Sequence, residues 1–304
     1  MISMKHLRYF AALAQHGHFG RAAEACAISQ PALSLQIKEL EEIIGAPLVE
    51  RGNRQVRLTA LGELFAARAQ GILHSVDELT NLARASGSAL VGKLHIGMIP
   101  TIAPYLLPAV IRRLIDGFPG IDLRPREAVT RKLIEDLGNG RLDVAVVALP
   151  VSEPSLQEYP LFEEEFILVR PDADRMNPVP SSEMLREMRL LLLEEGHCFR
   201  DQALAFCHMT TSPQRDLMEG SSLSTLVQMV GAGIGVTLIP EMAVASETAL
   251  ARVSTARLAA PRPTRTIGMV WRKTNPLSEH FIRIGGIVRE EHARLRGTDD
   301  NTDA

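Results

Sequence analysis

Cysteine is scarce in this chain. Its 304 residues include only three, Cys26, Cys198 and Cys207. Three cysteines are too few for the disulfide framework of a secreted domain, so a reducing, cytoplasmic location is expected. In that compartment a free cysteine is either a small buried apolar side chain or a reactive thiol, and a disulfide formed there is transient and regulatory.

Long apolar runs and targeting signals are also lacking. No run approaches the ~20 residues that span a membrane. Residues 1–5 lead straight into a helix with a polar face, so no signal peptide is expected. With 46% hydrophobic and 23% charged residues, the composition is that of a globular protein with room for two domain cores. A membrane partner is therefore not expected.

Motifs for metals, nucleotide cofactors and hydrolysis are missing too. The glycine-rich residues 231–235 precede a strand-like run instead of opening a helix, so they are not a dinucleotide fingerprint. His197 and His208 are too far apart for the usual metal-binding pairs, and the spacing of Cys198 and Cys207 does not match a zinc knuckle. No serine-hydrolase elbow occurs. The sequence predicts no metal, no cofactor and no enzyme activity.

The N-terminal residues have a helix-turn-helix pattern. Apolar spacing predicts helices over residues 4–16 and 20–25, and a third helix after the N-cap Ser29. The buried stripe of the third helix consists of Leu33, Ile37, Leu40 and Ile44. A short helix, a tight connection and a longer helix are typical of a motif whose second helix reads the DNA major groove.

The outward face of the third helix carries the side chains expected to meet DNA. They are Gln30, Pro31, Ser34, Leu35 and Lys38. Gln30 suits adenine, and an outward Leu35 suits a thymine methyl group. A hairpin wing follows, with arginines placed for phosphates or a minor groove: Arg51, Arg54 and Arg57. Residues 1–60 carry seven basic and five acidic side chains, net +2 against −3 for the whole chain, so double-stranded DNA is the expected partner.

A long helix is predicted from the N-cap Thr59 to about residue 86. Its apolar residues recur at alternating spacings of four and three, which is a heptad seam. The seam residues are Phe65, Ala69, Ile72, Val76, Leu79 and Ala83. One interpretation is a helix packed on its own domain. The length of the helix favours pairing with a second copy of the chain, and residues 85–88 are expected to form a hinge.

Further along the chain, strands and helices alternate. Strands are predicted at residues 94–99, 121–124, 142–148, 166–169, 190–193, 236–239 and 266–270. Helices are predicted at residues 104–116, 130–137, 222–230 and 276–296. This succession indicates an α/β fold with parallel strands and helices on the sheet faces. Two small lobes joined by crossing strands would leave a cleft between them.

Three regions follow from these patterns. Residues 1–60 are predicted to form a winged helix-turn-helix domain, and residues 61–90 a linker helix with its hinge. Residues 91–304 are predicted to form a two-lobed α/β regulatory domain. Its lobe I is expected to comprise residues 91–162 and 268–296, and its lobe II residues 163–267.

Two of the cysteines flank one short predicted helix. A buried strand at residues 190–193 leads to it, and apolar spacing predicts a helix over residues 199–207, with Arg200 off the buried face. Cys198 then lies at the helix N-terminus beside His197 and Arg200. The helix dipole and neighbouring cations favour the thiolate there, and only the thiolate attacks a peroxide or a disulfide.

The second thiol, Cys207, follows nine residues after Cys198. On a continuous helix this separation is ~13 Å along the axis, whereas a disulfide needs Cα atoms within about 7 Å. Pairing the two thiols would require the helix between them to unwind, so oxidation would become a change of shape. The alternative is that both cysteines are small buried apolar side chains.

Four polar residues are further candidates for the same site. Thr101 follows the first strand of the regulatory region, at the end where such sheets bind ligands. Thr130 opens a helix, and N-capping is the alternative role for its hydroxyl. Asp201 either holds His197 or pairs with the helix N-terminus, and Arg265 either steadies the thiolate or forms a surface salt bridge.

The run from Gly196 to Gln202, followed by Ala205-Phe206-Cys207, resembles the redox segment of the OxyR-type peroxide sensors, a branch of the LysR-type transcriptional regulators. Residues 19–25 and 29–34 resemble the helix-turn-helix of the same family. The resemblance covers nearly the whole chain. It implies that hydrogen peroxide oxidises Cys198 and that Cys207 resolves the product as a disulfide.

The resemblance also implies the remaining parts of a peroxide-responsive activator. The regulatory domain would be built like a periplasmic binding protein, and the linker helix would make a homodimer that assembles into a tetramer. RNA polymerase would be a partner, and peroxide-defence genes the target. The residues that match the peroxide site of the family are Thr101, Thr130, His197, Asp201 and Arg265.

Two other functions compete with this interpretation. A LysR-type regulator with incidental cysteines would answer a small organic anion in the cleft between its lobes, and calorimetric titration would reveal it. A thiol peroxidase would turn over peroxide repeatedly with a thiol reductant. The N-terminal DNA-binding pattern argues against the peroxidase.

Overall fold

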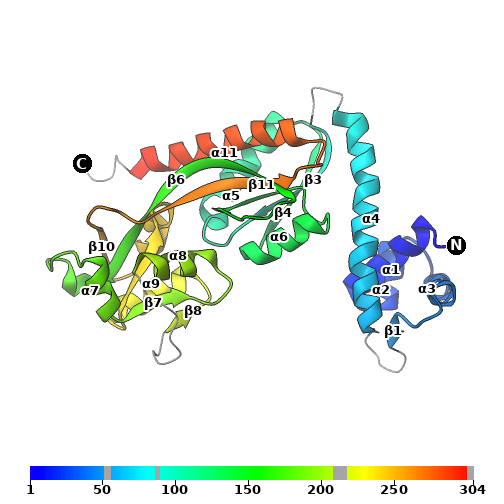
Figure 1. Cartoon of the computed structure of the whole chain (residues 1–304), viewed down its shortest axis with the longest axis horizontal. Coiled ribbons are helices and arrows are strands. Elements are labelled where there is room, and N and C mark those ends of the chain that lie inside the picture. Colours follow the sequence, from blue (N-terminus) through cyan, green and yellow to red (C-terminus); the bar gives the residue numbers. More distant parts are fainter. Residues whose placement is uncertain (51–55, 86–89, 208–217, 300–304) are drawn as a thin grey trace. The chain divides into compact units, whose positions relative to one another are not determined.

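The computed structural model describes residues 1–50, 56–85, 90–207 and 218–299. The turn of the predicted wing and most of the predicted hinge lie outside these residues. The chain divides into two compact units, residues 1–87 with 138–141 and residues 88–137 with 142–304 (Figure 1). Among the described helices, none has the length and apolarity needed to cross a membrane.

The first unit has the predicted helix-turn-helix and wing. Its elements are α1 (Met4–His16), α2 (Phe19–Ala25), α3 (Gln30–Ile44), β1 (Val49–Glu50), β2 (Arg57–Leu58) and α4 (Ala60–Ala85). Ser29 caps α3 as expected, because its side chain accepts a hydrogen bond from the backbone N–H of Ala32. The predicted stripe is buried at Leu33, Ile37 and Leu40. The wing strands pair antiparallel.

Helix α4 packs against α1 of the same unit. The ring of Phe65 meets that of Phe10 edge-on, with 5.4 Å between their centroids. Phe65, which was predicted to belong to the dimer seam, is partly buried against the core of its own domain. Ile72 and Leu79 are 49% and 65% exposed, so this part of the seam is open in the single chain. The side chain of Ala83 lies outside the described ones.

The second unit is the predicted two-lobed α/β domain. Its longer strands are β3 (Gly92–Met98), β4 (Ile121–Glu127), β5 (Val144–Leu149), β6 (Leu156–Pro171), β7 (Leu190–Leu193), β9 (Val236–Pro240) and β11 (Thr264–Arg272). Its longer helices are α5 (Ala103–Gly117), α6 (Thr130–Gly138), α8 (Cys198–Phe206), α9 (Leu223–Gly231) and α11 (Ser278–Asp299). The elements that the sequence did not predict are η1 (Asp172–Asp174), α7 (Ser182–Glu187), β8 (Glu219–Gly220), η2 (Glu241–Ala243), α10 (Val244–Thr248) and β10 (Val253–Arg257).

The strands form one continuous path in the order β4-β3-β5-β11-β6-β9-β7-β8, with β10 added to β6. Within lobe I, β3 is parallel to β4 and to β5. Within lobe II, β7 is parallel to β8 and to β9. Predicted site residues follow one strand of each lobe, Thr101 after β3 and His197 after β7.

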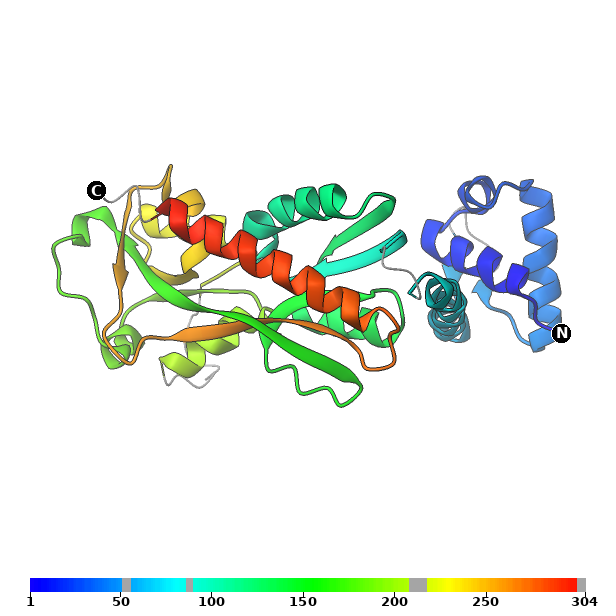
Figure 2. The same ribbon diagram turned by 90° about the horizontal axis from the view of Figure 1, so that it is seen from above.

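Two long antiparallel strands, β6 and β11, connect the lobes, and α11 lies along them (Figures 1 and 2). Their register pairs Arg265 with Glu164 and shifts between Ile267 and Gly268. A Cβ atom at Gly268 would lie 2.3 Å from Cδ1 of Leu149 and 2.9 Å from the carbonyl oxygen of Tyr159. Only glycine fits this close approach, which lets β11 pass between β5 and β6.

Candidate functional site

The local sequence explains why a helix begins at Cys198. All four residues of β7 are buried, so this strand is fixed in the core of lobe II. Gly196 follows with φ of +97°, a backbone conformation that favours glycine. His197 then occupies the N-cap of α8 in an extended conformation, and its side chain makes no capping hydrogen bond. The N–H of Arg200 is bonded to the carbonyl oxygen of His197, and no N-cap side chain neutralises the positive end of the α8 dipole.

Cys198 is half-buried and faces a narrow crevice with about 160 Å³ of empty space, its open mouth included. The crevice is lined by Ile99, Pro100, Thr101, Val129, Thr130, His197, Cys198 and Phe199. The structure therefore brings three of the five predicted peroxide-site residues together with Cys198. They come from the ends of β3 and β7 and from the start of α6, as the parallel topology requires.

Arg265 reaches this crevice through Thr101. Its Nη1 donates to Oγ1 of Thr101 at 2.8 Å, and its Nη2 donates to the carbonyl oxygen of Thr101 at 3.2 Å. Its guanidinium lies 5.3 Å from the ring centroid of Phe199. Because Arg265 is 2% exposed and pairs with the buried Glu164, the surface salt bridge considered above is wrong.

The hydroxyl of Thr130 has no hydrogen-bond partner within the described part of the chain, although it is buried. The N-capping role is therefore wrong, since an N-cap hydroxyl would accept a backbone N–H. A buried polar group without a partner costs roughly 1–3 kcal/mol. This hydroxyl lies at the crevice of Cys198, where a polar ligand would satisfy it.

His197 and Arg200, which were expected to be cations beside Cys198, do not provide positive charge there. Burial lowers the pKa of His197 against the opposing effect of Glu194 and Glu127, which favours the neutral ring. Arg200 is buried and turns to lobe II, where its Nη1 donates to the carbonyl oxygen of Leu193 at 2.9 Å and to Oε1 of Glu219 at 2.5 Å. Its prediction as a cation off the buried face is wrong. The α8 N-terminus itself remains as the positive partner of a thiolate.

Asp201 is the predicted site residue that the structure does not bring to the crevice. It lies in the first turn of α8 with an exposed side chain. It is not among the residues that line the crevice. Its position is that of the alternative role, an acidic side chain near a helix N-terminus.

Cys207 lies at the opposite end of α8. Its side chain is fully buried among the apolar residues of lobe II, and burial raises the pKa of its thiol to about 11. All three cysteines are free. Since α8 is continuous from Cys198 to Phe206, the backbones of the two cysteines lie ~13 Å apart along its axis.

A second cavity of about 110 Å³ adjoins the crevice and shares Thr101 and His197 with it. Tyr105 Oη donates to Glu247 at 2.6 Å, and Ser224 donates to the same carboxylate at 2.5 Å. Glu127 also lines this cavity, and no Lys or Arg does so among the described residues. Two carboxylates without a cation disfavour an anionic ligand. Within the described chain, no group of three His, Cys, Asp or Glu could hold a metal ion.

The face of α3 that was predicted to meet DNA is exposed at each of its five residues. Leu35 is 65% exposed, which is unusual for leucine and suits a base contact. Arg57 is exposed on β2, whereas Arg51 and Arg54 lie outside the described residues. No sequence pattern marks Glu41. Its Oε1 accepts the backbone N–H groups of Leu48 and Val49 at 2.7 and 3.0 Å, which connects α3 to the wing.

Comparisons with known proteins identify two family domains in this chain. Residues 4–63 match the bacterial regulatory helix-turn-helix proteins of the lysR family, and residues 87–292 match the LysR substrate binding domain. A probable hydrogen peroxide-inducible genes activator of Streptomyces viridosporus is 42% identical, over 95% of this chain and 94% of its own length. The DNA-binding transcriptional dual regulator OxyR of Escherichia coli is 39% identical, over 97% of both chains.

Solved structures give the same result. A full-length OxyR variant from Pseudomonas aeruginosa superposes with a TM-score of 0.76, at 37% identity over 95% of both chains. A hydrogen peroxide-bound OxyR mutant from Corynebacterium glutamicum superposes with a TM-score of 0.69, at 31% identity over 99% of this chain and 96% of that one.

Proposed function

Because the chain belongs to the OxyR branch of the LysR family and is a DNA-binding, peroxide-sensing activator, we propose that Cys198 is the thiol that reacts with hydrogen peroxide and that Cys207 resolves it. One observation carries this proposal. The two thiols occupy opposite ends of a single intact helix, one at a crevice that holds two threonine side chains and a histidine, and the other inside an apolar core.

In the first step, the Cys198 thiolate attacks one oxygen of hydrogen peroxide. The S–O bond forms as the O–O bond breaks, the sulfur becomes a sulfenic acid, and the second oxygen leaves as hydroxide and takes a proton to become water. The attacking species is the thiolate, and Cys198 lies at the electropositive N-terminus of α8. The hydroxyls of Thr101 and Thr130, with the neutral ring of His197, are groups that can orient the peroxide and stabilise charge on the departing oxygen.

In the second step, the sulfur of Cys207 attacks the sulfenic acid, which releases water and leaves a disulfide. A disulfide needs Cα atoms within about 7 Å, so α8 must unwind before the two sulfurs meet. Unwinding removes Cys207 from the core and separates Arg200 from Leu193 and Glu219. Peroxide chemistry is thus converted into a rearrangement of lobe II, which is the signal passed to the DNA-binding domains.

The charges of the second cavity weaken the organic-anion alternative, because Glu127 and Glu247 would repel such an effector. Titration calorimetry with small carboxylates should therefore register no binding. The peroxidase alternative predicts sustained peroxide consumption with a thiol reductant. A regulator with no enzyme activity consumes one peroxide per chain and then stops until it is reduced.

The assembly follows from the first unit. We place the exposed face of α3 in the major groove and the wing on the neighbouring backbone, with α4 pairing two chains through Ile72 and Leu79. The homotetramer, the contact with RNA polymerase and the cytoplasmic location belong to the same proposal. Analytical ultracentrifugation of an Ile72→Glu, Leu79→Glu variant tests the pairing, and a dimer that persists unchanged contradicts it.

Mass spectrometry of the peroxide-treated protein tests the central claim. One equivalent of peroxide should join Cys198 to Cys207 within a chain and leave Cys26 free. Cys207→Ser should stop at the sulfenic acid, and Cys198→Ser should form neither product and lose the transcriptional response. Cys26→Ser is the control and should respond normally. A full response in Cys198→Ser would overturn the proposal.

A further inference from the structure

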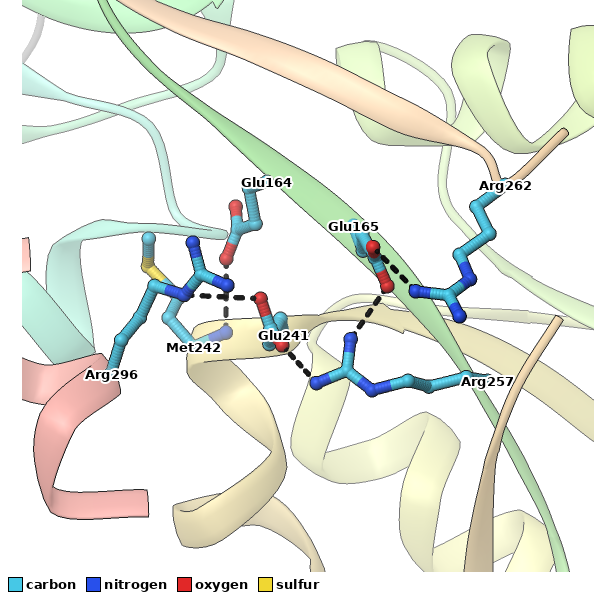
Figure 3. A network of polar contacts seen from close by, with 7 residues as sticks. All are labelled: Glu164, Glu165, Glu241, Met242, Arg257, Arg262 and Arg296. Atoms are coloured by element: carbon cyan, nitrogen blue, oxygen red, sulfur yellow. Dashed lines mark hydrogen bonds and ion pairs between the residues drawn. The ribbon is translucent and has the colours of Figure 1, made fainter. Parts of the chain in front are cut away.

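Glu164 is a buried carboxylate for which the mechanism above has no role. It lies on β6 opposite Arg265 of β11, and both side chains of this pair are fully buried. A buried ion pair seldom gains stability over an apolar pair of the same size, so its presence calls for another reason. The neighbouring carboxylate of Glu165 points the other way, to the exposed arginines Arg257 and Arg262 (Figure 3).

Both oxygens of Glu164 are held. Oε2 accepts from Nε and Nη2 of Arg265 at 2.9 and 2.7 Å. Oε1 accepts the backbone N–H of Met242 in η2 at 3.0 Å (Figure 3). The preceding residue, Glu241, is itself bound by Arg257 and by Arg296 of α11. The carboxylate of Glu164 is therefore held in one position, because it binds both Arg265 of β11 and the backbone of η2.

The fixed carboxylate determines how Arg265 meets Thr101. Two guanidinium nitrogens face Glu164, so the remaining Nη1 is directed at Oγ1 of Thr101. An arginine has no acceptor, so the threonine oxygen must accept this bond. A hydroxyl has one proton, and that proton is then left to be donated elsewhere. Thr101 lines the crevice with Cys198 as well as the adjoining cavity, so this proton is available to a ligand in the crevice.

We infer that Glu164 is a positioning residue for the peroxide reaction, acting through Arg265 to make Thr101 a hydrogen-bond donor to the departing oxygen. The inference rests on the proposed reaction of Cys198. As the thiolate attacks and the O–O bond breaks, the electron pair of that bond moves to the distal oxygen. The hydroxyl of Thr101 donates a hydrogen bond to this oxygen but keeps its proton, and the hydroxide is protonated by solvent.

The test uses the full chain with Cys207→Ser, so that Cys198 stops at the sulfenic acid. Two rate constants are measured, one for hydrogen peroxide and one for iodoacetamide, which needs the thiolate but no stabilised leaving oxygen. Glu164→Gln should lower the peroxide rate constant about tenfold, because a loosened donor is misplaced. It should leave the iodoacetamide rate constant unchanged. Glu165→Gln is the matched control and should change neither.

A double-mutant cycle separates positioning from general support of the fold. Once Thr101→Val has removed the hydroxyl, adding Glu164→Gln should lower the peroxide rate constant no further. Additive losses, equal losses toward both reagents, or an unchanged peroxide rate in Glu164→Gln would each overturn the role of Glu164. Failure of the parent Cys207→Ser protein to react with peroxide would overturn the proposed function as well.

Loss of the buried charge could also unfold the protein, so thermal melting accompanies each variant. If Glu164→Gln does not fold, the paired change Glu164→Leu with Arg265→Met replaces the ion pair by apolar groups. Thr101 then lacks its arginine, and the peroxide rate constant should again fall about tenfold with iodoacetamide unaffected. A peroxide rate equal to that of the parent would overturn the inference.

Discussion

The two ends of α8 place one thiol each in opposite environments. At the N-terminal end, Cys198 shares its crevice with two threonines and a histidine and begins the helix itself. At the C-terminal end, Cys207 is surrounded by apolar side chains, and burial raises its pKa to about 11. Nine residues of helix are thus enough to make one thiol available and the other inert. What keeps them different is the helix itself, so any event that opens it removes the difference.

The largest expected contrast is in their reactivity toward an alkylating reagent. A thiol with a pKa of about 11 is a thiolate in only about one molecule in three thousand at pH 7.5, and Cys207 is also fully buried. Iodoacetamide should label Cys198 of the reduced, folded protein at least 100-fold faster than Cys207. Peptide mass spectrometry over time measures both rates. In urea the two rates should converge, and equal rates in the folded protein would contradict the comparison.

The next contrast is in stability at high pH. The folded pKa of Cys207 lies above its unfolded value, so the unfolded state loses its proton first as the pH rises. The free energy of unfolding should therefore fall between pH 9 and pH 11, by about 2–3 kcal/mol from this group at 1.36 kcal/mol per pKa unit. Urea unfolding of the parent and of Cys207→Ala isolates the contribution of this thiol, since the variant lacks it. If the free energy of unfolding falls equally with pH in both proteins, burial does not raise the pKa of Cys207.

In the crevice beside Cys198, the buried hydroxyl of Thr130 has no hydrogen-bond partner among the described residues. Removing it should have opposite effects on stability and on reactivity. Thr130→Val removes a buried group that lacks a partner, so the protein should be more stable by about 1 kcal/mol. The same change removes a candidate ligand of the peroxide and should slow sulfenic acid formation about tenfold. Thr130→Ser keeps the hydroxyl and is the control for both measurements. A variant that is less stable and reacts at the parent rate would contradict this account.

Features that depend on local spacing were predicted correctly from the sequence, whereas contacts between distant residues were not. Local spacing predicted helix α8 between its two cysteines and the N-cap of α3 at Ser29, and both are confirmed. The direction of Arg200 does not, because its partner Glu219 lies on a two-residue strand that no local pattern marks. Thr101 and Arg265 were each singled out, but their contact was not.

Long-range register explains why that contact was missed. Thr101 and Arg265 are 164 residues apart, and Glu164 is 101 residues from its arginine. The pairing of β6 with β11, and the shift at Gly268 within it, decides which side chains face each other. A carboxylate on a strand reads locally as an outward polar residue, so Glu164 resembled Glu165 until the register was known. The contact of Phe65 with Phe10 was missed for a similar reason, since the heptad spacing of one helix does not reveal which residues of another helix it meets.

The smallest expected effect concerns the bond between Arg200 and Glu219, which stabilises α8 against unwinding. The bond from Arg200 to Glu219 is charge-assisted, and Glu219→Gln keeps its geometry but removes the charge. A loss of about 1 kcal/mol should make unwinding about fivefold more frequent, so the disulfide should form up to about five times faster while sulfenic acid formation is unchanged. Quenched-flow mass spectrometry resolves the two steps.

The control is Glu187→Gln, which also removes one negative charge, from an exposed side chain of α7, and should change neither step. If Glu219→Gln leaves the second step at the parent rate, opening of the helix is not what limits disulfide formation, and the two ends of α8 are kept apart by the burial of Cys207 alone.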